Sequence, residues 1–223
     1  MKNIEYYLQN LNIIYEDNHL LVVEKFINVL SQKDNTGDLD MTDIIKLYIK
    51  RKYNKLGNVY LGLLHRLDRR VGGVMVFAKT SKAAKRLSAD IRARQFAKTY
   101  LACLYGNLVE DGSIDIKLLK QKQKAIVSPK GKKALLHYQV INNINNKTYV
   151  KIDLITGRYN QIRASFAHIG YPVINDHKYH QGIKPNRDAL GLYCYRIKLN
   201  HPVTKEKLTF TSYPKGEIWE DMK

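Results

Sequence analysis

The chain has 223 residues, 44% of them apolar, and 38 Lys and Arg against 20 Asp and Glu give a formal charge of +18. This length and apolar content are enough for a buried core. So strong a positive charge predicts a polyanionic partner, nucleic acid before an anionic membrane surface. No apolar run approaches the ~20 residues that cross a bilayer, and Glu5, Gln9 and Asn10 interrupt any signal peptide. We therefore expect a cytoplasmic protein that does not insert into membranes.

Cysteine and histidine positions favour neither a disulfide framework nor a metal site. Cys103 and Cys194 stand among apolar or aromatic neighbours without CxxC spacing, which predicts two reduced thiols. His177 and His180 lie close to Asp176, but no thiolate or HExxH pattern accompanies them. Walker A and GxGxxG glycine patterns are absent as well, so the sequence does not support nucleotide hydrolysis.

The first half of the chain predicts a strand and helix pattern that follows an N-terminal tail, residues 1–12. The apolar run at residues 19–25 is bounded by polar residues and favours a strand. Residues 40–55 predict an amphipathic helix with Asp at its N-cap. Residues 73–79 predict a buried strand, and residues 80–96 predict a second amphipathic helix.

The second half is dominated by strands. Apolar alternation and β-branched residues predict strands at residues 98–106, 133–141, 147–156 and 205–213, with a turn at 142–146. No repeat or linker divides the chain, and strands and helices do not alternate regularly. We therefore expect an α+β fold: one catalytic domain over residues 13–215, on a mixed, mostly antiparallel β-sheet flanked by helices and loops, with a C-terminal tail over residues 216–223.

One carboxylate, Asp68, lies among three arginines in the segment LLHRLDRRVGG, residues 63–73. Because a carboxylate repels phosphate, its place in a basic segment needs a reason. One hypothesis is structural, an ion pair or an Asx-type turn before Gly72 and Gly73. The other is catalytic, a nucleophile or base kept ionised by arginine. The position alone favours the structural hypothesis.

Two other basic segments are candidates for anion binding. In residues 156–170, Arg158 and Arg163 follow a strand, and Gly157 permits a tight turn into a helix whose start suits an anion. A solvated basic helix end explains that spacing equally well. Residues 117–133 contain seven lysines and no acid, which is compatible with a flexible connection but, on so basic a chain, favours phosphate contact.

The segment His65-Arg66-Leu67-Asp68-Arg69 resembles the HRLD-R motif of the RluA-type RNA pseudouridine synthases. Further segments resemble parts of that family's pattern and follow in its order, at residues 14–17, 20–25, 77–80, 98–102, 157–158, 161–163, 167–172, 201–204 and 210–211. The resemblance thus runs from about Ile14 to Thr211 and implies the pseudouridine synthase fold. Few residues precede it, so RNA affinity is expected to come from the catalytic domain itself rather than from an N-terminal RNA-binding domain.

The resemblance also implies roles for individual residues. Asp68 would be the catalytic aspartate, Tyr100 an active-site tyrosine on or near the target base, and Arg163 the ion-pair partner of Asp68. Arg66 would displace the flipped nucleotide or fill the gap that it leaves. The residues expected to bind the RNA substrate are His65, Arg66, Arg69, Arg158 and Gln161.

The sequence departs from the family pattern at several positions. Val71-Gly72-Gly73 stands where the family commonly has Thr-Ser-Gly, so two hydroxyls that could fix the turn are missing. Asn160 and Ser165 replace two usual histidines, Phe26 replaces a proline, and Asn175 replaces a glycine. These changes bear on substrate identity more than on the chemistry, because Asp68, Tyr100 and Arg163 are all present.

The implied activity is that of an isomerase: uracil is detached from its ribose, rotated and rejoined through carbon 5, without a cofactor. The expected partner is RNA, with one or more uridines of rRNA or tRNA as the target, and the expected state is a monomer. The missing hydroxyls and histidines favour one rival, a non-catalytic RNA-binding or ribosome-assembly factor with the same fold. A glycosidase, which needs two cooperating carboxylates, is less well supported.

Overall fold

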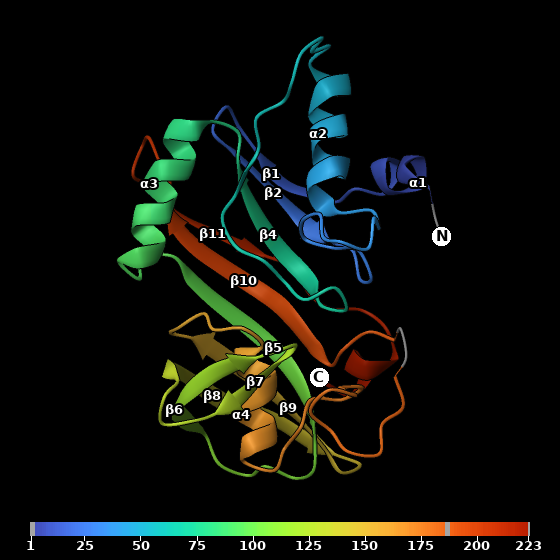
Figure 1. The fold of residues 1–223 in the computed structure, drawn as a ribbon, viewed down its shortest axis with the longest axis vertical. Helices are drawn as coiled ribbons and strands as arrows, with labels where there is room; N and C mark the ends of the chain where they lie inside the picture. Colours follow the sequence, from blue (N-terminus) through green and yellow to red (C-terminus); the bar gives the residue numbers. More distant parts are fainter. Residues whose placement is uncertain (1–2, 186–187, 223) are drawn as a thin grey trace. The chain divides into compact units, whose positions relative to one another are not determined.

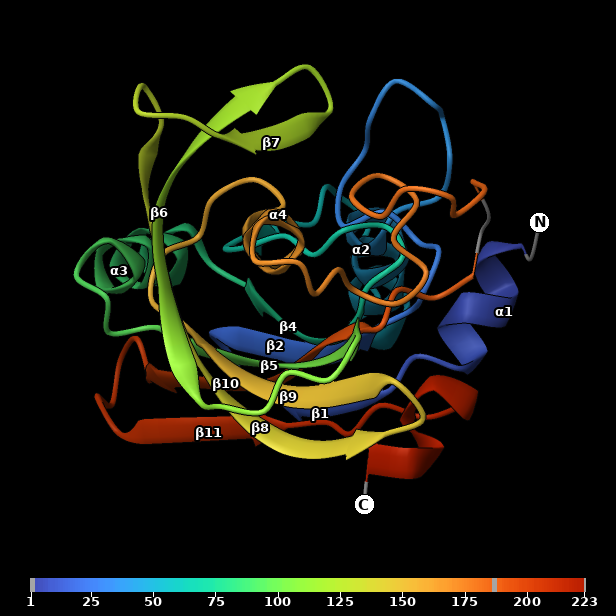
Figure 2. The same cartoon turned by 90° about the horizontal axis from the view of Figure 1, so that it is seen from below.

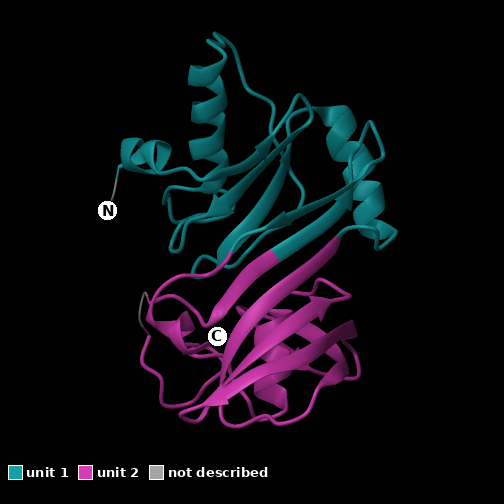
Figure 3. Ribbon diagram, turned by 180° about the vertical axis from the view of Figure 1, so that it is seen from behind, with its two compact units in different colours: residues 1–96, 196–212 teal, residues 97–195, 213–223 magenta. Residues whose placement is uncertain are grey.

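The computed structural model describes residues 3–185 and 188–222, which form two compact units (Figure 3). Unit 1 comprises residues 1–96 and 196–212, and unit 2 comprises residues 97–195 and 213–223. The strand β10 (Leu192–Asn200) contributes its first four residues to unit 2 and its last five to unit 1. The single domain expected over residues 13–215 stays a prediction.

Unit 1 contains an antiparallel sheet in which β2 (Leu20–Lys25) lies between β1 (Ile13–Glu16) and β4 (Gly72–Ala78) (Figure 1). The apolar run of β2 is fully buried, as a strand covered on both faces should be. Its register pairs Lys25 with Gly73, so the end of β2 lies beside the start of β4. The short strand β3 (Gly62–Leu63) pairs with the end of β4.

The two helices predicted in unit 1, at residues 40–55 and 80–96, are both present. In α2 (Met41–Lys52), Asp40 caps the first turn by accepting hydrogen bonds from the N–H groups of Thr42 and Asp43. In α3 (Ser81–Arg92), the Thr80 hydroxyl accepts one from the N–H of Ala83. Both caps satisfy donors that have no partner within the helix.

The N-terminal stretch expected to be a tail contains the helix α1 (Ile4–Gln9). Asn3 caps it, and Glu5 forms an ion pair with Arg51 of α2 at 2.6 Å. That contact joins residues 46 positions apart, so no local pattern could reveal it. The last strand of this unit, β11 (Lys207–Thr211), pairs antiparallel with Arg196–Asn200 and confirms the strand predicted there.

Unit 2 contains a second set of antiparallel strands. Their order is β5-β9-β8-β6-β7, and their bounds are Ala97–Tyr105 for β5, Gly112–Gln121 for β6, Lys124–Val127 for β7, Lys132–Ile144 for β8 and Lys147–Leu154 for β9. The predicted turn between β8 and β9 is a two-residue hairpin, in which Asn145 and Asn146 take positive φ angles of 51° and 58°. Asparagine tolerates that conformation, which type I′ turns require.

The strands β6 and β7 form a hairpin where the lysine-rich sequence predicts a connection or a phosphate contact. Ile114, Leu118 and Ala125 are its buried side chains, and the last two cluster with Ala134 of β8 and Ala164 of helix α4 (Gln161–His168). Within unit 2, β6 bends so that the hairpin covers one side of α4 (Figure 2). The lysines between residues 117 and 133 interrupt the apolar alternation that would indicate a strand pair.

The C-terminal stretch expected to be a tail also has structure. Residues Glu217–Met222 form a 3₁₀ helix, and Trp219 is buried against Tyr149 and Tyr193. The Tyr149 hydroxyl donates a hydrogen bond to the carbonyl of Ile218 at 2.8 Å. Burial of one large aromatic side chain is enough to order so short a segment.

The observed elements confirm the α+β class and the mostly antiparallel sheet. Every strand pair of known register is antiparallel. Within residues 3–185 and 188–222, no helix has the length and apolar composition needed to span a bilayer.

Candidate active site

Asp68 begins a tight turn that leads into β4 in unit 1. Its carbonyl accepts a hydrogen bond from the N–H of Val71 at 3.0 Å, with Arg69 and Arg70 as the central residues. Aspartate is favoured at the first position of such a turn. The side chain is half-buried. The turn thus fixes the backbone of Asp68.

Ser31 forms hydrogen bonds with both backbone groups of Leu67, the residue before Asp68. The buried Ser31 hydroxyl donates to the carbonyl of Leu67 at 2.7 Å and accepts from the N–H of Leu67 at 3.0 Å. Both backbone groups of Leu67 are therefore satisfied by one side chain 36 residues away. No pattern around Ser31 marked it in the sequence.

Lys25 lies beneath the same turn and is 1% exposed. Its ammonium donates hydrogen bonds to the carbonyls of Phe26, Arg69 and Val71 at 2.9, 3.0 and 2.9 Å. Burial lowers the pKa of Lys25 to about 7, the negative charge of Asp68 acts in the opposite direction, and Arg69 lowers it further. Lys25 therefore binds the turn from below and lies near enough to Asp68 for the two charges to interact, where the sequence leads us to expect only a distant arginine.

The three other predicted residues of this segment differ in their surroundings. Arg69 donates to the carbonyl of Asn28 at 3.2 Å and forms an ion pair with Asp38 at 2.5 Å. His65 accepts the N–H of Val76 through Nε2 at 3.1 Å. Arg66 is exposed and, in the described part of the chain, has no hydrogen-bond or ion-pair partner. Of these three, Arg66 is best placed to reach a ligand.

Val71, Gly72 and Gly73, which replace the family's Thr-Ser-Gly, are all buried. Gly73 has a φ of 120°, a conformation that side chains rarely adopt. Contacts of Lys25 and Ser31 therefore fix this turn in place of hydroxyls within the segment.

Tyr100 lies in unit 2 at the middle of β5 and is 6% exposed. Burial raises the pKa of Cys194 to about 12, against the smaller effect of the Lys98 charge. Cys194 and Cys103 are both buried free thiols, which confirms the expectation for the cysteines.

Gln161 shapes the loop that leads into α4. Its side-chain oxygen accepts from the N–H of Arg158 and the hydroxyl of Thr156, both at 2.9 Å, and its amide donates to the carbonyl of Leu135 at 3.1 Å. Gln161 is 3% exposed, so its amide serves the loop. The exposed Arg158 donates from Nε to the carbonyl of Lys133 at 2.8 Å.

Arg163 projects from α4 to Asp176. Its Nε and Nη2 each lie 2.7 Å from a carboxylate oxygen of Asp176, a bidentate pair in which Arg163 is 5% and Asp176 0% exposed. Tyr179 lies beside the pair, with its ring centroid 5.2 Å from the guanidinium carbon. The pairing of Arg163 with Asp68 that the resemblance implies stays a prediction.

The structure thus places His65, Arg66, Asp68 and Arg69 together on the segment before β4 in unit 1. It places Tyr100 on β5 and Arg158, Gln161 and Arg163 at α4, all in unit 2. In the described ranges no three His, Cys, Asp or Glu residues form a group that could hold a metal ion.

Comparisons with known proteins identify the family of this chain. The family model described as RNA pseudouridylate synthase matches residues 19–168. Ribosomal large subunit pseudouridine synthase D of Pseudomonas aeruginosa is 36% identical over 94% of this chain and 70% of that protein. The dual-specificity RNA pseudouridine synthase RluA of Haemophilus ducreyi is 30% identical over 90% of this chain and 92% of that protein.

Ribosomal large subunit pseudouridine synthase C of Buchnera aphidicola is 34% identical over 90% of this chain, which spans 66% of that relative's length. Among solved structures, human RNA pseudouridylate synthase domain containing 4 superposes with a TM-score of 0.79 at 22% identity, covering 94% of this chain and 92% of that one. It confirms the fold. The family and its enzyme class, an isomerase acting on RNA, are those that the motifs predict. The chain belongs to the RluA-type RNA pseudouridine synthases.

Proposed function

We propose that this chain converts one or more uridines of structured RNA, in rRNA or tRNA, to pseudouridine, with Asp68 as the catalytic aspartate. The observation that carries the proposal is the fixed backbone that carries Asp68 in the HRLDR segment: Ser31 binds Leu67, Lys25 binds the carbonyls of Arg69 and Val71, and a backbone hydrogen bond closes the turn. A group that starts covalent chemistry must be held in place in this way. The relatives' names, which refer to the ribosomal large subunit or to dual specificity, support the substrate class.

The reaction breaks the bond from ribose C1′ to uracil N1 and forms one from C1′ to C5, while the C5 proton leaves and N1 gains a proton. Atoms and electrons balance without a co-reactant. Asp68 acts either as a nucleophile on the sugar or uracil, or as a base at the ribose 2′ position with a glycal intermediate. Both routes need an ionised carboxylate beside the target nucleotide.

The remaining predicted residues take supporting roles in this proposal. Tyr100 contacts the target base, and Arg163 pairs with Asp68. Arg66, exposed and without a partner in the described ranges, occupies the place of the flipped nucleotide. Internal hydrogen bonds hold the segments that bind RNA, and the residues that form them are His65, Arg69 and Gln161.

RNA binding and base flipping are linked by charge. A stacked uridine is out of reach, and flipping it costs a few kcal/mol. Contacts between phosphates and a chain of formal charge +18 offset that cost. We further propose a monomer that acts in the cytoplasm, which light scattering on the purified protein and fractionation of cells would test.

The test is pseudouridine formation in total RNA from cells with and without the gene, mapped at single-nucleotide resolution. Purified protein should restore the missing positions, and the Asp68→Asn variant should restore none while binding RNA about as well as the wild type. Full turnover by Asp68→Asn would overturn the role of Asp68. The same pseudouridine map in both strains would favour an RNA-binding factor without catalysis.

A further inference from the structure

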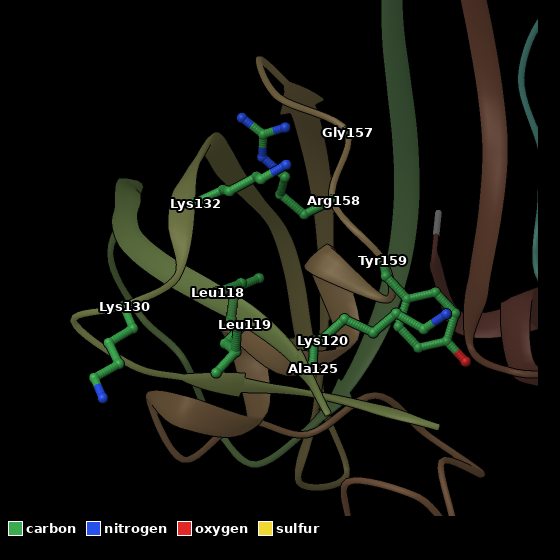
Figure 4. Close-up of a pocket in the computed structure, with 9 residues that line it drawn as sticks. All are labelled: Leu118, Leu119, Lys120, Ala125, Lys130, Lys132, Gly157, Arg158 and Tyr159. Carbon is green, nitrogen blue, oxygen red and sulfur yellow. The ribbon is translucent and has the colours of Figure 1, made fainter. Parts of the chain in front are cut away.

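Unit 2 contains a pocket of about 370 Å³ between the β6–β7 hairpin and the loop before α4 (Figure 4). Its lining is Leu118, Leu119, Lys120, Ala125, Lys130, Lys132, Gly157, Arg158 and Tyr159. Four of these residues are cationic and none is acidic. No carboxylate of the described ranges forms an ion pair with any of the four cations, so their charge is available to an anion.

Arg158 is fixed with its outer nitrogens available. Its Nε donates to the carbonyl of Lys133 at 2.8 Å, and its backbone N–H donates to the side-chain oxygen of Gln161 at 2.9 Å. In Figure 4 the guanidinium of Arg158 and the ammonium of Lys132 lie at the same side of the pocket. A guanidinium oriented in advance loses less freedom when it binds a phosphate in a bidentate manner.

The turn that carries Lys130 and Lys132 is held against β6. A side chain at Gly131 would begin 2.5 Å from the backbone carbon of Leu118, so this close approach needs glycine. Hydrogen bonds from Ser128 N–H to the carbonyl of Lys117 and from Gly131 N–H to the carbonyl of Ser128, at 3.0 and 2.9 Å, complete the turn. Both lysines therefore start from a fixed backbone.

An aromatic ring borders the cations. Tyr159 is 38% exposed, its hydroxyl donates to the carbonyl of Gln123 at 3.3 Å, and the Lys120 ammonium lies 4.9 Å from its ring centroid. The floor of the pocket is rigid, because Leu118 and Ala125 belong to the buried cluster that packs on α4. The Ala125 N–H donates to the Tyr179 hydroxyl at 2.7 Å and anchors the hairpin further.

We propose that this pocket binds one phosphodiester group of a single-stranded segment of the RNA substrate, with Lys132 and Arg158 at the phosphate and the adjoining nucleoside against Tyr159. The proposal rests on the proposed function in taking RNA as the ligand. Adjacent cations and an aromatic surface are the combination that single-stranded nucleic acid requires, because every base has a face that stacks.

The test is the binding of a fluorescently labelled single-stranded oligouridylate over a series of salt concentrations. Arg158→Ala and Lys132→Ala should each weaken binding about tenfold and lower the slope of log affinity against log salt by about 0.7, the change for one lost phosphate contact. Tyr159→Ala should weaken binding by a similar factor with the slope unchanged, because stacking releases no counterions, and Tyr159→Phe should bind as the wild type.

Lys215→Ala is the matched control, since Lys215 is an exposed lysine of unit 2 outside the pocket lining. If Arg158→Ala and Lys132→Ala change affinity and slope no more than this control, the pocket assignment is wrong. Binding is measured without turnover, so the two proposals can fail separately. A wild type that makes no pseudouridine but shows these slopes refutes only the proposed function.

Discussion

The guanidinium of Arg163 and the carboxylate of Asp176 form a buried bidentate pair, with both nitrogen–oxygen distances at 2.7 Å. The pair fixes the plane of the guanidinium before any substrate arrives, and Asp176 also accepts the N–H of Lys178 at 3.1 Å. In the sequence, Asp176 is only a neighbour of two histidines at which no metal site is expected. Its observed role is to orient an arginine expected at the active site.

Asp176→Asn should therefore destabilise the protein strongly. Removing one charge of a buried ion pair leaves the other uncompensated, which costs about 3–5 kcal/mol. The free energy of unfolding in urea measures this loss. The control is Asp115→Asn, because Asp115 pairs with Lys133 at the surface, with side-chain exposures of 51% and 60%. That exposed pair should contribute less than about 1 kcal/mol. Equal losses in the two variants would contradict the buried pair's importance.

Ser31→Ala should lower the turnover number more than it raises KM. The variant leaves the N–H and carbonyl of Leu67 without their shared partner, at a cost of about 1–3 kcal/mol in unfolding free energy, and loosens the backbone that carries Asp68. Single-turnover kinetics and urea unfolding measure the two effects. Ser113→Ala, at an exposed position of β6, should change neither. A normal turnover number in Ser31→Ala would show that the hydroxyl does not position Asp68.

Glu16 should make the stability of unit 1 depend on pH in the acid range. Burial alone would raise the pKa of Glu16, but hydrogen bonds from Lys52, Lys79, Tyr48 and Tyr53 lower it from 4.5 to about 2. Because the folded-state pKa is the lower one, this stability is present above pH 4.5 and is lost as the pH falls towards 2. The loss should be at most about 3 kcal/mol.

Urea unfolding at several pH values checks this expectation with Glu16→Gln. The free energy of unfolding of the wild type should exceed that of the variant by a constant amount above about pH 5. This difference should shrink as the pH approaches about 2. Glu5→Gln, which removes an exposed partner of Arg51, should show a much smaller dependence. A difference between wild type and Glu16→Gln that is independent of pH would refute the assigned cause.

Gly131→Ala should move the turn that carries Lys130 and Lys132. The new Cβ would lie within 3 Å of three backbone atoms of Leu118, none of which can move cheaply. We expect a loss of about 1–3 kcal/mol in unfolding free energy and weaker RNA binding. Gly57→Ala is the control, since a Cβ there meets no atom within 4 Å. Unchanged stability and affinity in Gly131→Ala would show that the turn can shift without consequence.

Local patterns were sufficient for most elements of the fold. The run of β2, the caps of α2 and α3 and the turn before β9 each depend on neighbouring residues, so periodicity and capping rules identify them. The β6–β7 hairpin is not evident from local patterns, because Leu118 and Ala125 are buried against a helix far along the chain and lysines separate the two residues. For the same reason α1 and the segment around Trp219 were expected to be tails.

The sequence by itself determined the charge, the HRLDR segment and, through the order of the motifs, the family. Only the tertiary structure decided what surrounds these residues: Ser31 and Lys25 at the Asp68 turn, Asp176 at Arg163, and four cations around one pocket. The physical reason is that a buried hydrogen bond or ion pair requires only that its partners meet in space, and the chain distance between them leaves no local pattern.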